Sequence, residues 1–329
     1  MAEARLERPR AGLVVLALAA VLATAAPWAV EGQTLRLAVE VFVMIAMAQA
    51  WNLLAGYTGF VSVGQQAFVG LGAYALFLAA IRGGIDAFTA VLIGGGVAAA
   101  VGALAAPALF RLRGPQFAIG TWVLAELLRI AFTNIEWFGG ASGLTLARAL
   151  RGVPLERRVH TTYWIALALA VGATLAVYLL LRSPFGLALR TVRDNEASAQ
   201  SVGVAVGRVK FRVFVLASFL TGCAGAVSYL NTMFVTTSAA FALEWSALVI
   251  FVVIIGGLGT LEGPILGALV YFALREWLAD HGTWYVITLG ATAIAVMMLA
   301  PEGLWGRLSR RTGWVLFPAR VRLVRPRRR

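Results

Sequence analysis

Apolar stretches of about twenty residues recur along almost all of this 329-residue chain and constrain its fold more than any other feature. A helix needs about 20 apolar residues to cross the hydrocarbon core of a bilayer. The stretch at 245–272 is interrupted by the run GGLGTLEGP, which predicts two short helices joined by a tight bend. The complete set of apolar stretches is 11–30, 35–55, 60–81, 87–110, 115–133, 162–181, 211–231, 245–272 and 284–300. The sequence therefore predicts an all-α integral membrane protein, a polytopic bundle of about ten (8–10) transmembrane segments, some short or broken.

Composition supports this class and excludes several others. Hydrophobic residues make up 60% of the chain and charged residues 13%, about half the charge of a soluble domain. A single cysteine, Cys223, excludes an internal disulfide framework, and two histidines, His160 and His281, leave little for a metal centre. We therefore expect no metal site.

The positions of the cations predict how the chain sits in the membrane. With ten spans both termini lie on one side, and that side holds 20 of the 28 Lys and Arg residues against seven on the other. Cytoplasmic loops carry the excess of Lys and Arg. This predicts a cytoplasmic segment at 1–10, a membrane domain at 11–300 and a basic cytoplasmic tail at 301–329, with an outer loop at 134–161 and a cytoplasmic loop at 182–210.

The basic tail does not indicate nucleic-acid binding. Its cations have no interleaved aromatic platform and no recognition-module motif around them, so a location at the lipid surface explains them better. The arginines of its last ten residues are Arg320, Arg322, Arg325, Arg327, Arg328 and Arg329.

Charges inside the spans bear on the source of energy. Ion-driven carriers place charged groups deep in their spans, where these groups coordinate the transported ion. The clear intramembrane charges here are Glu126 and Arg129, which are three residues apart and so share a helix face. They can neutralise each other or line a solute path. So few buried charges disfavour an ion-coupled carrier, and no Walker-type phosphate loop occurs in the chain, so we expect the energy to come from another subunit.

The cytoplasmic loop has the pattern of a short capped helix. Ser183-Pro184 marks a helix start or a turn, and Asp194 and Asn195 are favourable N-cap residues. The Glu-Ala-Ser-Ala-Gln run that follows predicts a helix that stops near Gly203. Such an element at the membrane face suits insertion into a groove on a cytoplasmic partner.

This loop and three further stretches resemble one family, the branched-chain amino acid ABC transporter permeases of the LivM type. The further stretches are 52–74, which begins NLLAGYTG; 113–129, which begins RGPQFAI; and 256–268, which begins GGLGTLEGP. The resemblance covers roughly 52–304, and it departs from the family at Gln65, where a histidine is frequent. Within the loop the matching residues, which the resemblance identifies as an ATPase-coupling region, are Arg190, Arg193, Asp194, Asn195, Glu196, Ala199 and Gly203.

The resemblance implies a transport subunit of an ATP-driven importer in the bacterial inner membrane. Its expected partners are a second, LivH-like permease, two cytoplasmic ATP-binding subunits and an extracytoplasmic solute-binding protein. The chain itself would be no enzyme and would bind no cofactor, since ATP and magnesium belong to the ATP-binding subunits. The expected solutes are leucine, isoleucine, valine or related amino acids. Urea or short-chain amides are an alternative within the class, and an ion-coupled secondary carrier is an alternative outside it.

Two further groups of residues are candidates for function. Polar side chains in apolar spans are costly without a partner and so indicate a translocation path; they are Asn52, Gln65, Gln66, Glu126 and Arg129. Small residues and one proline permit tight bends and close helix approach, and are candidates for hinges and packing; they are Gly56, Gly59, Gly256, Gly257, Gly259, Gly263 and Pro264.

Overall fold

The computed structural model describes residues 3–6, 10–278, 284–300, 302–313, 316–317 and 321–324. Several residues considered above lie outside these ranges: His281 and the tail arginines Arg320, Arg325 and Arg327 to Arg329. Within the described ranges the chain is mostly helical, as the long apolar stretches predict. The elements, in chain order, are β1 (Glu3–Leu6), α1 (Arg10–Ala29), α2 (Gly32–Thr58), α3 (Gln65–Ile81), α4 (Ala90–Leu109), α5 (Pro115–Asn134), η1 (Glu136–Phe138), η2 (Gly140–Ser142), β2 (Leu144–Thr145), α6 (Leu155–Arg182), α7 (Pro184–Asp194), α8 (Glu196–Ser201), α9 (Val206–Thr232), β3 (Phe234–Val235), α10 (Thr237–Ala240), α11 (Glu244–Gly256), α12 (Gly263–Leu278), α13 (Trp284–Leu299), α14 (Gly303–Thr312) and β4 (Val321–Val324).

The helices bear out a polytopic all-α membrane protein. Five segments of the described chain are long and apolar enough to cross a membrane: α2, α4, α6, α9 and the stretch Thr237–Gly256. Other apolar helices are shorter, among them α3, α12 and α13, with 17, 16 and 16 residues. The broken stretch at 245–272 forms two helices, α11 and α12, separated by residues 257–262, as its glycine-rich run predicts.

Several segment boundaries differ from those drawn on hydropathy alone; α9, for example, begins at Val206 rather than at residue 211. Residues 60–64 are not helical, so α3 begins at Gln65, five residues later than the apolar stretch. Here the chain is hydrogen-bonded by side chains: the Val63 N–H donates to Thr121 Oγ1 at 3.1 Å and the Gly64 N–H to Ser62 Oγ at 3.3 Å. At the other end of the molecule α6 begins at Leu155 and takes up the last residues of the expected outer loop.

Helix α9 forms the centre of the bundle and packs against α2, α3, α4 and α6. The close approach depends on small residues. A Cβ at Gly72 of α3 would collide with the Gly222 carbonyl of α9, and one at Gly95 of α4 would collide with Cys223. Small residues at these positions let helix backbones approach within a membrane, where burial of apolar surface gives little drive for association.

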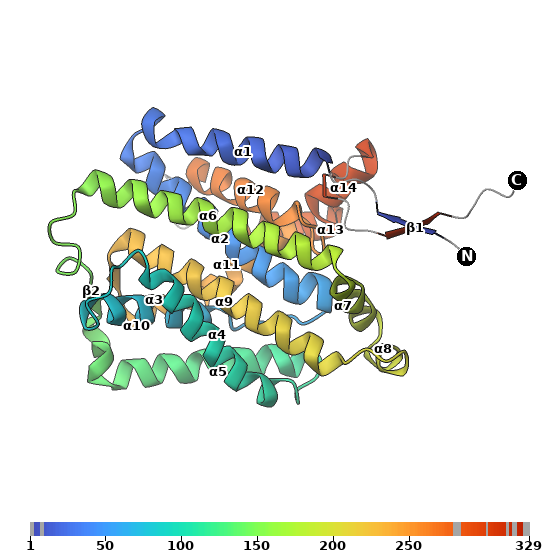
Figure 1. Cartoon of the computed structure of the whole chain (residues 1–329), viewed down its shortest axis with the longest axis horizontal. Coiled ribbons are helices and arrows are strands. Elements are labelled where there is room, and N and C mark those ends of the chain that lie inside the picture. The colour runs from blue at the N-terminus through green and yellow to red at the C-terminus, as the bar shows by residue number, and fades with distance from the viewer. Residues whose placement is uncertain are drawn as a thin grey trace, which may run out of the picture.

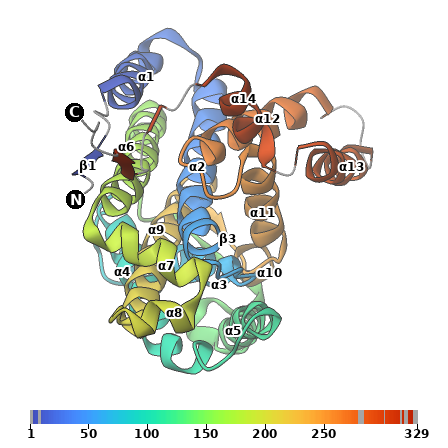
Figure 2. The ribbon, with the colours of Figure 1, turned by 90° about the vertical axis from the view of Figure 1, so that its right-hand side faces the viewer.

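The two ends of the bundle carry different structures (Figure 1). Helices α7, α8 and α14 lie at one end together with β1 and β4, which pair antiparallel and so hold the two ends of the chain together. The segments β2, β3 and α10 lie at the opposite end, where β2 pairs with β3. The cytoplasmic and outer loops of the sequence analysis are therefore at opposite ends of the molecule. Figure 2, which looks onto the first end, shows α5 at the periphery of the bundle.

Candidate functional site

Helices α7 and α8 form a compact turn at the first end of the bundle. The side chain of Asn195 caps α8 by accepting a hydrogen bond from the Ser198 N–H at 3.0 Å. Gly203 takes a left-handed φ of +87°, and the Val204 N–H returns to the Ala199 carbonyl at 3.0 Å, which ends the helix. The cap and the stop are those that the sequence predicts. Ala199 is buried, whereas Asp194, Asn195 and Glu196 are exposed.

Glu196 fixes α8 to the start of α9. Its carboxylate forms an ion pair with Lys210, with Nζ 2.7 Å from Oε1 and 2.8 Å from Oε2. The same ammonium lies 4.4 Å from the centre of the Phe60 ring, in the non-helical segment before α3. Lys210, which the sequence analysis did not single out, therefore joins α8, α9 and the segment between α2 and α3 through one group.

The arginines of α7 connect this turn to the loop between α11 and α12. Arg193 lies against two glycines: its Cγ would be 3.9 Å from a Cβ at Gly59, and its Nη1 3.0 Å from a Cβ at Gly259. Gly59 ends α2 and Gly259 lies in residues 257–262. Arg190, one turn earlier in α7, is half-buried. Arg193 of α7 therefore lies beside both the end of α2 and residues 257–262.

Asn52 holds residues 257–262 from the side of α2. This fully buried amide donates from Nδ2 to the Thr260 carbonyl at 2.7 Å, and its Oδ1 accepts from the Gly259 N–H at 2.8 Å. Gln49, one turn earlier, donates from Nε2 to the Leu261 carbonyl at 2.8 Å. Asn52, a path candidate by sequence, is thus placed as a two-point clamp on a loop. Gln49 was not among the sequence candidates, although it too is a polar residue in an apolar span, the signal that could have found it.

The glycines of this region are placed where backbones meet. A Cβ at Gly56 would collide with the backbone of Gly259, and one at Gly256 would collide with the Gly263 carbonyl. Gly257 has a φ of +133°, which residues with a side chain rarely adopt. Pro264 follows Gly263 in the first turn of α12, where its missing N–H is not needed. The structure places the candidate hinge and packing residues in one region, the junction of α2, α11 and α12.

A buried carboxylate anchors the C-terminal segment to the same loop. Oε1 of Glu262 accepts a hydrogen bond from the Phe317 N–H at 2.9 Å, and the Phe317 ring packs against Tyr178 at 5.4 Å between centroids. Burial raises the pKa of Glu262, and backbone N–H groups that favour the carboxylate oppose this rise. The sequence analysis did not single out Glu262, although an acidic residue within an apolar stretch is a signal that could have found it.

A second set of candidates forms a polar cluster in the interior. Ser246 of α11 accepts the Gln65 N–H at 2.9 Å and donates to Oε1 of Gln66. Thr221 of α9 donates to Oε1 of Gln65 at 3.0 Å. Nε2 of Gln65 is buried with no hydrogen-bond partner in the described part of the chain. Gln65 and Gln66 therefore lie together at the start of α3, between α9 and α11, and one polar atom there is left without a partner.

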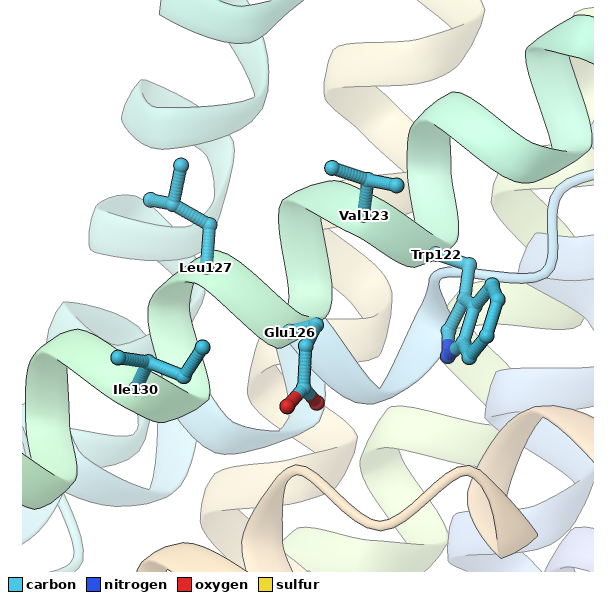
Figure 3. Close-up of a pocket in the computed structure, with 5 residues that line it drawn as sticks. All are labelled: Trp122, Val123, Glu126, Leu127 and Ile130. Atoms are coloured by element: carbon cyan, nitrogen blue, oxygen red, sulfur yellow. The ribbon is translucent and has the colours of Figure 1, made fainter.

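Glu126 and Arg129 lie elsewhere, three residues apart on the outward, partly exposed face of α5. Figure 3 shows Glu126 and its neighbours on this helix. Arg129 Nε is 2.9 Å from Oε2 of Glu126 and 3.1 Å from Oε1, so the two charges neutralise each other along the helix. The side chain of Arg129 is 37% exposed and that of Glu126 is 43% exposed. An open pocket over the same face is lined by Trp122, Val123, Glu126, Leu127 and Ile130.

The family model described as "Branched-chain amino acid transport system / permease component" matches residues 33–300, which include every candidate site residue. The chain belongs to this family. It is 29% identical over 309 residues to the high-affinity branched-chain amino acid transport system permease protein LivM of Escherichia coli (strain K12), covering 86% of this chain and 72% of the relative. The resemblance to LivM-type permeases is confirmed.

Relatives with other cargoes are also found. The chain is 31% identical over 196 residues to the autoinducer 2 import system permease protein LsrC of Klebsiella pneumoniae, covering 55% of this chain and 53% of the relative. It is 29% identical over 147 residues to the ribose import permease protein RbsC of Haemophilus influenzae, covering 43% of this chain and 45% of the relative. No solved structure matches. This chain is a permease of an ABC transporter, and its relatives are named as transport permeases.

Proposed function

We propose that this permease imports branched-chain amino acids (leucine, isoleucine and valine) as one transmembrane subunit of an ATP-driven importer. The observation that supports this solute class is the likeness to LivM, which extends over 86% of the chain. The importer contains a second, LivH-like permease, two cytoplasmic ATP-binding subunits that hold ATP and magnesium, and an extracytoplasmic solute-binding protein. The assembly lies in the bacterial inner membrane with both termini of this chain cytoplasmic, because the end with α7, α8 and α14 carries most cations.

The exposed residues of α7 and α8 dock on the ATP-binding subunits. When ATP draws those subunits together, α7 and α8 move with them. The movement reaches the membrane interior by two connections: the Arg193 contact with residues 257–262, which Asn52 joins to α2, and the Glu196–Lys210 pair, which joins α8 to α9. The docking surface of α7 and α8 is shaped by Arg190, Asp194, Asn195, Ala199 and Gly203. Helices α11 and α12 change position about a hinge. The hinge is formed by Gly56, Gly59, Gly256, Gly257, Gly259, Gly263 and Pro264.

The solute passes along the outward face of α5, where the second permease covers it. A Glu–Arg pair that faced hydrocarbon would be costly, so protein or water must cover Glu126 and Arg129. A zwitterionic amino acid carries the same two charges and can exchange with the partners of this pair. Behind that face Thr121 of α5 contacts the backbone of residues 63–64, beside Gln65 and Gln66, so the polar cluster backs the path.

Reconstitution tests this assignment. The tagged chain is purified from native membranes in mild detergent, its partners are identified by mass spectrometry, and the complex is reconstituted with ATP inside the vesicles and the solute-binding protein outside. We expect ATP-dependent uptake of labelled leucine, isoleucine and valine, with urea, a short-chain amide and ribose as comparison solutes. Preferred uptake of a comparison solute would refute the solute class. Ion-dependent uptake by the chain alone would refute the ABC mechanism.

A further inference from the structure

The segment before α6 carries charge that the positive-inside bias disfavours. Cations are depleted from outer loops. Residues 147–158 nevertheless contain four arginines and a single carboxylate, Glu156. They lie at the end of the bundle opposite to α7 and α8 (Figure 1). A concentration of cations on this side needs a physical reason other than orientation in the membrane.

The structure holds this segment in a defined shape. Strand β2, just before the segment, pairs with β3, and two leucines anchor the loop that follows: Leu146 and Leu150 are buried, at 0% and 2% exposure. Arg158 accounts for one of the four cations, because it donates from Nε to the Val153 carbonyl and from Nη2 to the Leu150 carbonyl, both at 2.7 Å. It therefore braces the loop from within, and the other three arginines stand on a fixed support.

Arg148, Arg151 and Arg157 have no such role. All three are exposed, and none forms an ion pair or a side-chain hydrogen bond within the described part of the chain. Arg157 lies in the first turn of α6, where the positive end of the helix dipole disfavours a cation. Two other cations at this end have partners: Arg82 lies 4.5 Å from the centre of the Trp137 ring, and Arg275 pairs with Glu40.

The length of α6 and the positions of the three arginines in the sequence place them beyond the hydrocarbon core. Helix α6 has 28 residues, so it is ~42 Å long, against a hydrocarbon core of about 30 Å. Arg157 precedes the apolar stretch at 162–181 by five residues, ~7.5 Å along the helix, which is the depth of one headgroup layer. Arg148 and Arg151 lie in the loop that projects past the ends of the neighbouring helices in Figure 1.

We propose that Arg148, Arg151 and Arg157 form a docking platform for an acidic surface of the extracytoplasmic solute-binding protein. The inference rests on the proposed function, which supplies such a partner on this side. Exposed guanidinium groups on a rigid support pair bidentately with carboxylates and attract an acidic protein from a distance. The platform gives the binding protein its orientation over the bundle, and the pairing is sensitive to ionic strength.

The test measures binding of the importer's own solute-binding protein to the complex in nanodiscs of neutral lipid, over a series of NaCl concentrations. We expect the triple variant Arg148→Gln, Arg151→Gln, Arg157→Gln to raise Kd by about tenfold or more at low salt and to flatten its salt dependence. The matched triple Lys variant keeps the charge and retains most of the affinity. Arg36→Gln, at the exposed start of α2 near the same face, is the control for loss of a single outer charge.

The outcomes separate the platform from the proposed function. A triple Gln variant with unchanged Kd and salt dependence, beside a wild type that binds, would overturn the platform alone. A wild-type complex that binds no solute-binding protein would overturn the proposed function and the platform with it. Vesicles with and without phosphatidylglycerol test lipid as the partner: if the Gln substitutions weaken only the response to anionic lipid, the platform is refuted. An unaltered gel-filtration profile and basal ATPase rate show that the variant complex is folded.

Discussion

Removal of the Asn52 side chain should loosen the junction of α2, α11 and α12 more than any other single amide substitution in α2. The Asn52→Ala variant leaves the Gly259 N–H and the Thr260 carbonyl, both in a partly buried loop, without their partners. A buried polar group that loses its hydrogen bond costs about 1–3 kcal/mol, so two such groups predict a loss of about 2–6 kcal/mol in the stability of this junction.

Gln49→Ala is the matched control, because it removes one hydrogen bond to the same loop. Oε1 of Gln49 has no hydrogen-bond partner among the described residues, so the substitution also removes a buried unsatisfied acceptor, which offsets part of the loss. We expect a cost of about 1 kcal/mol for Gln49→Ala, and under about 0.5 kcal/mol for Thr24→Ala, whose bond to the Val21 carbonyl is exposed.

Two measurements check this order. The thermal midpoint of the purified protein in detergent should fall most for Asn52→Ala, less for Gln49→Ala and least for Thr24→Ala. Hydrogen exchange should accelerate in peptides that contain residues 257–262, and more in Asn52→Ala than in Gln49→Ala. If exchange in this loop is the same in Asn52→Ala as in the wild type, the clamp does not hold the loop and the reasoning is wrong.

Three further predictions concern charged groups. Glu196→Lys and Lys210→Glu should each reduce ATP-dependent uptake by reconstituted complexes, because each disrupts the link between α8 and α9. The double variant, which exchanges the two charges, should recover part of the uptake. If it recovers none, the pair is not the link. Glu126→Gln and Arg129→Gln should each raise the KM for uptake. Each should cost under about 1 kcal/mol of stability, because the ion pair is partly exposed. Unchanged KM and unchanged solute preference would show that neither residue lines the path. Burial raises the pKa of Glu262, so the stability that this group contributes is complete below about pH 4.3 and is lost as the pH rises through its folded-state pKa. Glu262→Gln keeps an oxygen acceptor for the Phe317 N–H. The thermal midpoint of this variant should therefore rise relative to that of the wild type as the pH is raised above about 4.3, and a difference that does not change with pH would contradict the assignment.

The long apolar stretches of the sequence determined most of the fold. Segments of about twenty apolar residues have to become helices in lipid, because every backbone polar group must be satisfied within the segment. Local chemistry determined the ends of α8 equally well, since the amide of Asn195 and the left-handed Gly203 act within a few residues of the helix. The boundary at residues 60–64 was missed because an apolar run does not reveal that side chains from Thr121 and Ser62 bond its backbone.

The placement of the polar residues was decided only by the tertiary structure. Hydropathy marks Asn52, Gln65 and Glu126 alike, as polar groups in apolar spans. The fold assigns them to three surroundings: Asn52 bonds a loop 207 residues away, Gln65 joins a buried cluster with Thr221 and Ser246, and Glu126 faces outward beside Arg129. Each partner comes from a distant segment, apart from Arg129, which lies on the next turn of the same helix. A sequence fixes which groups need partners, because that need is a property of the side chain. It does not fix which partner each group finds, because that depends on how the helices pack.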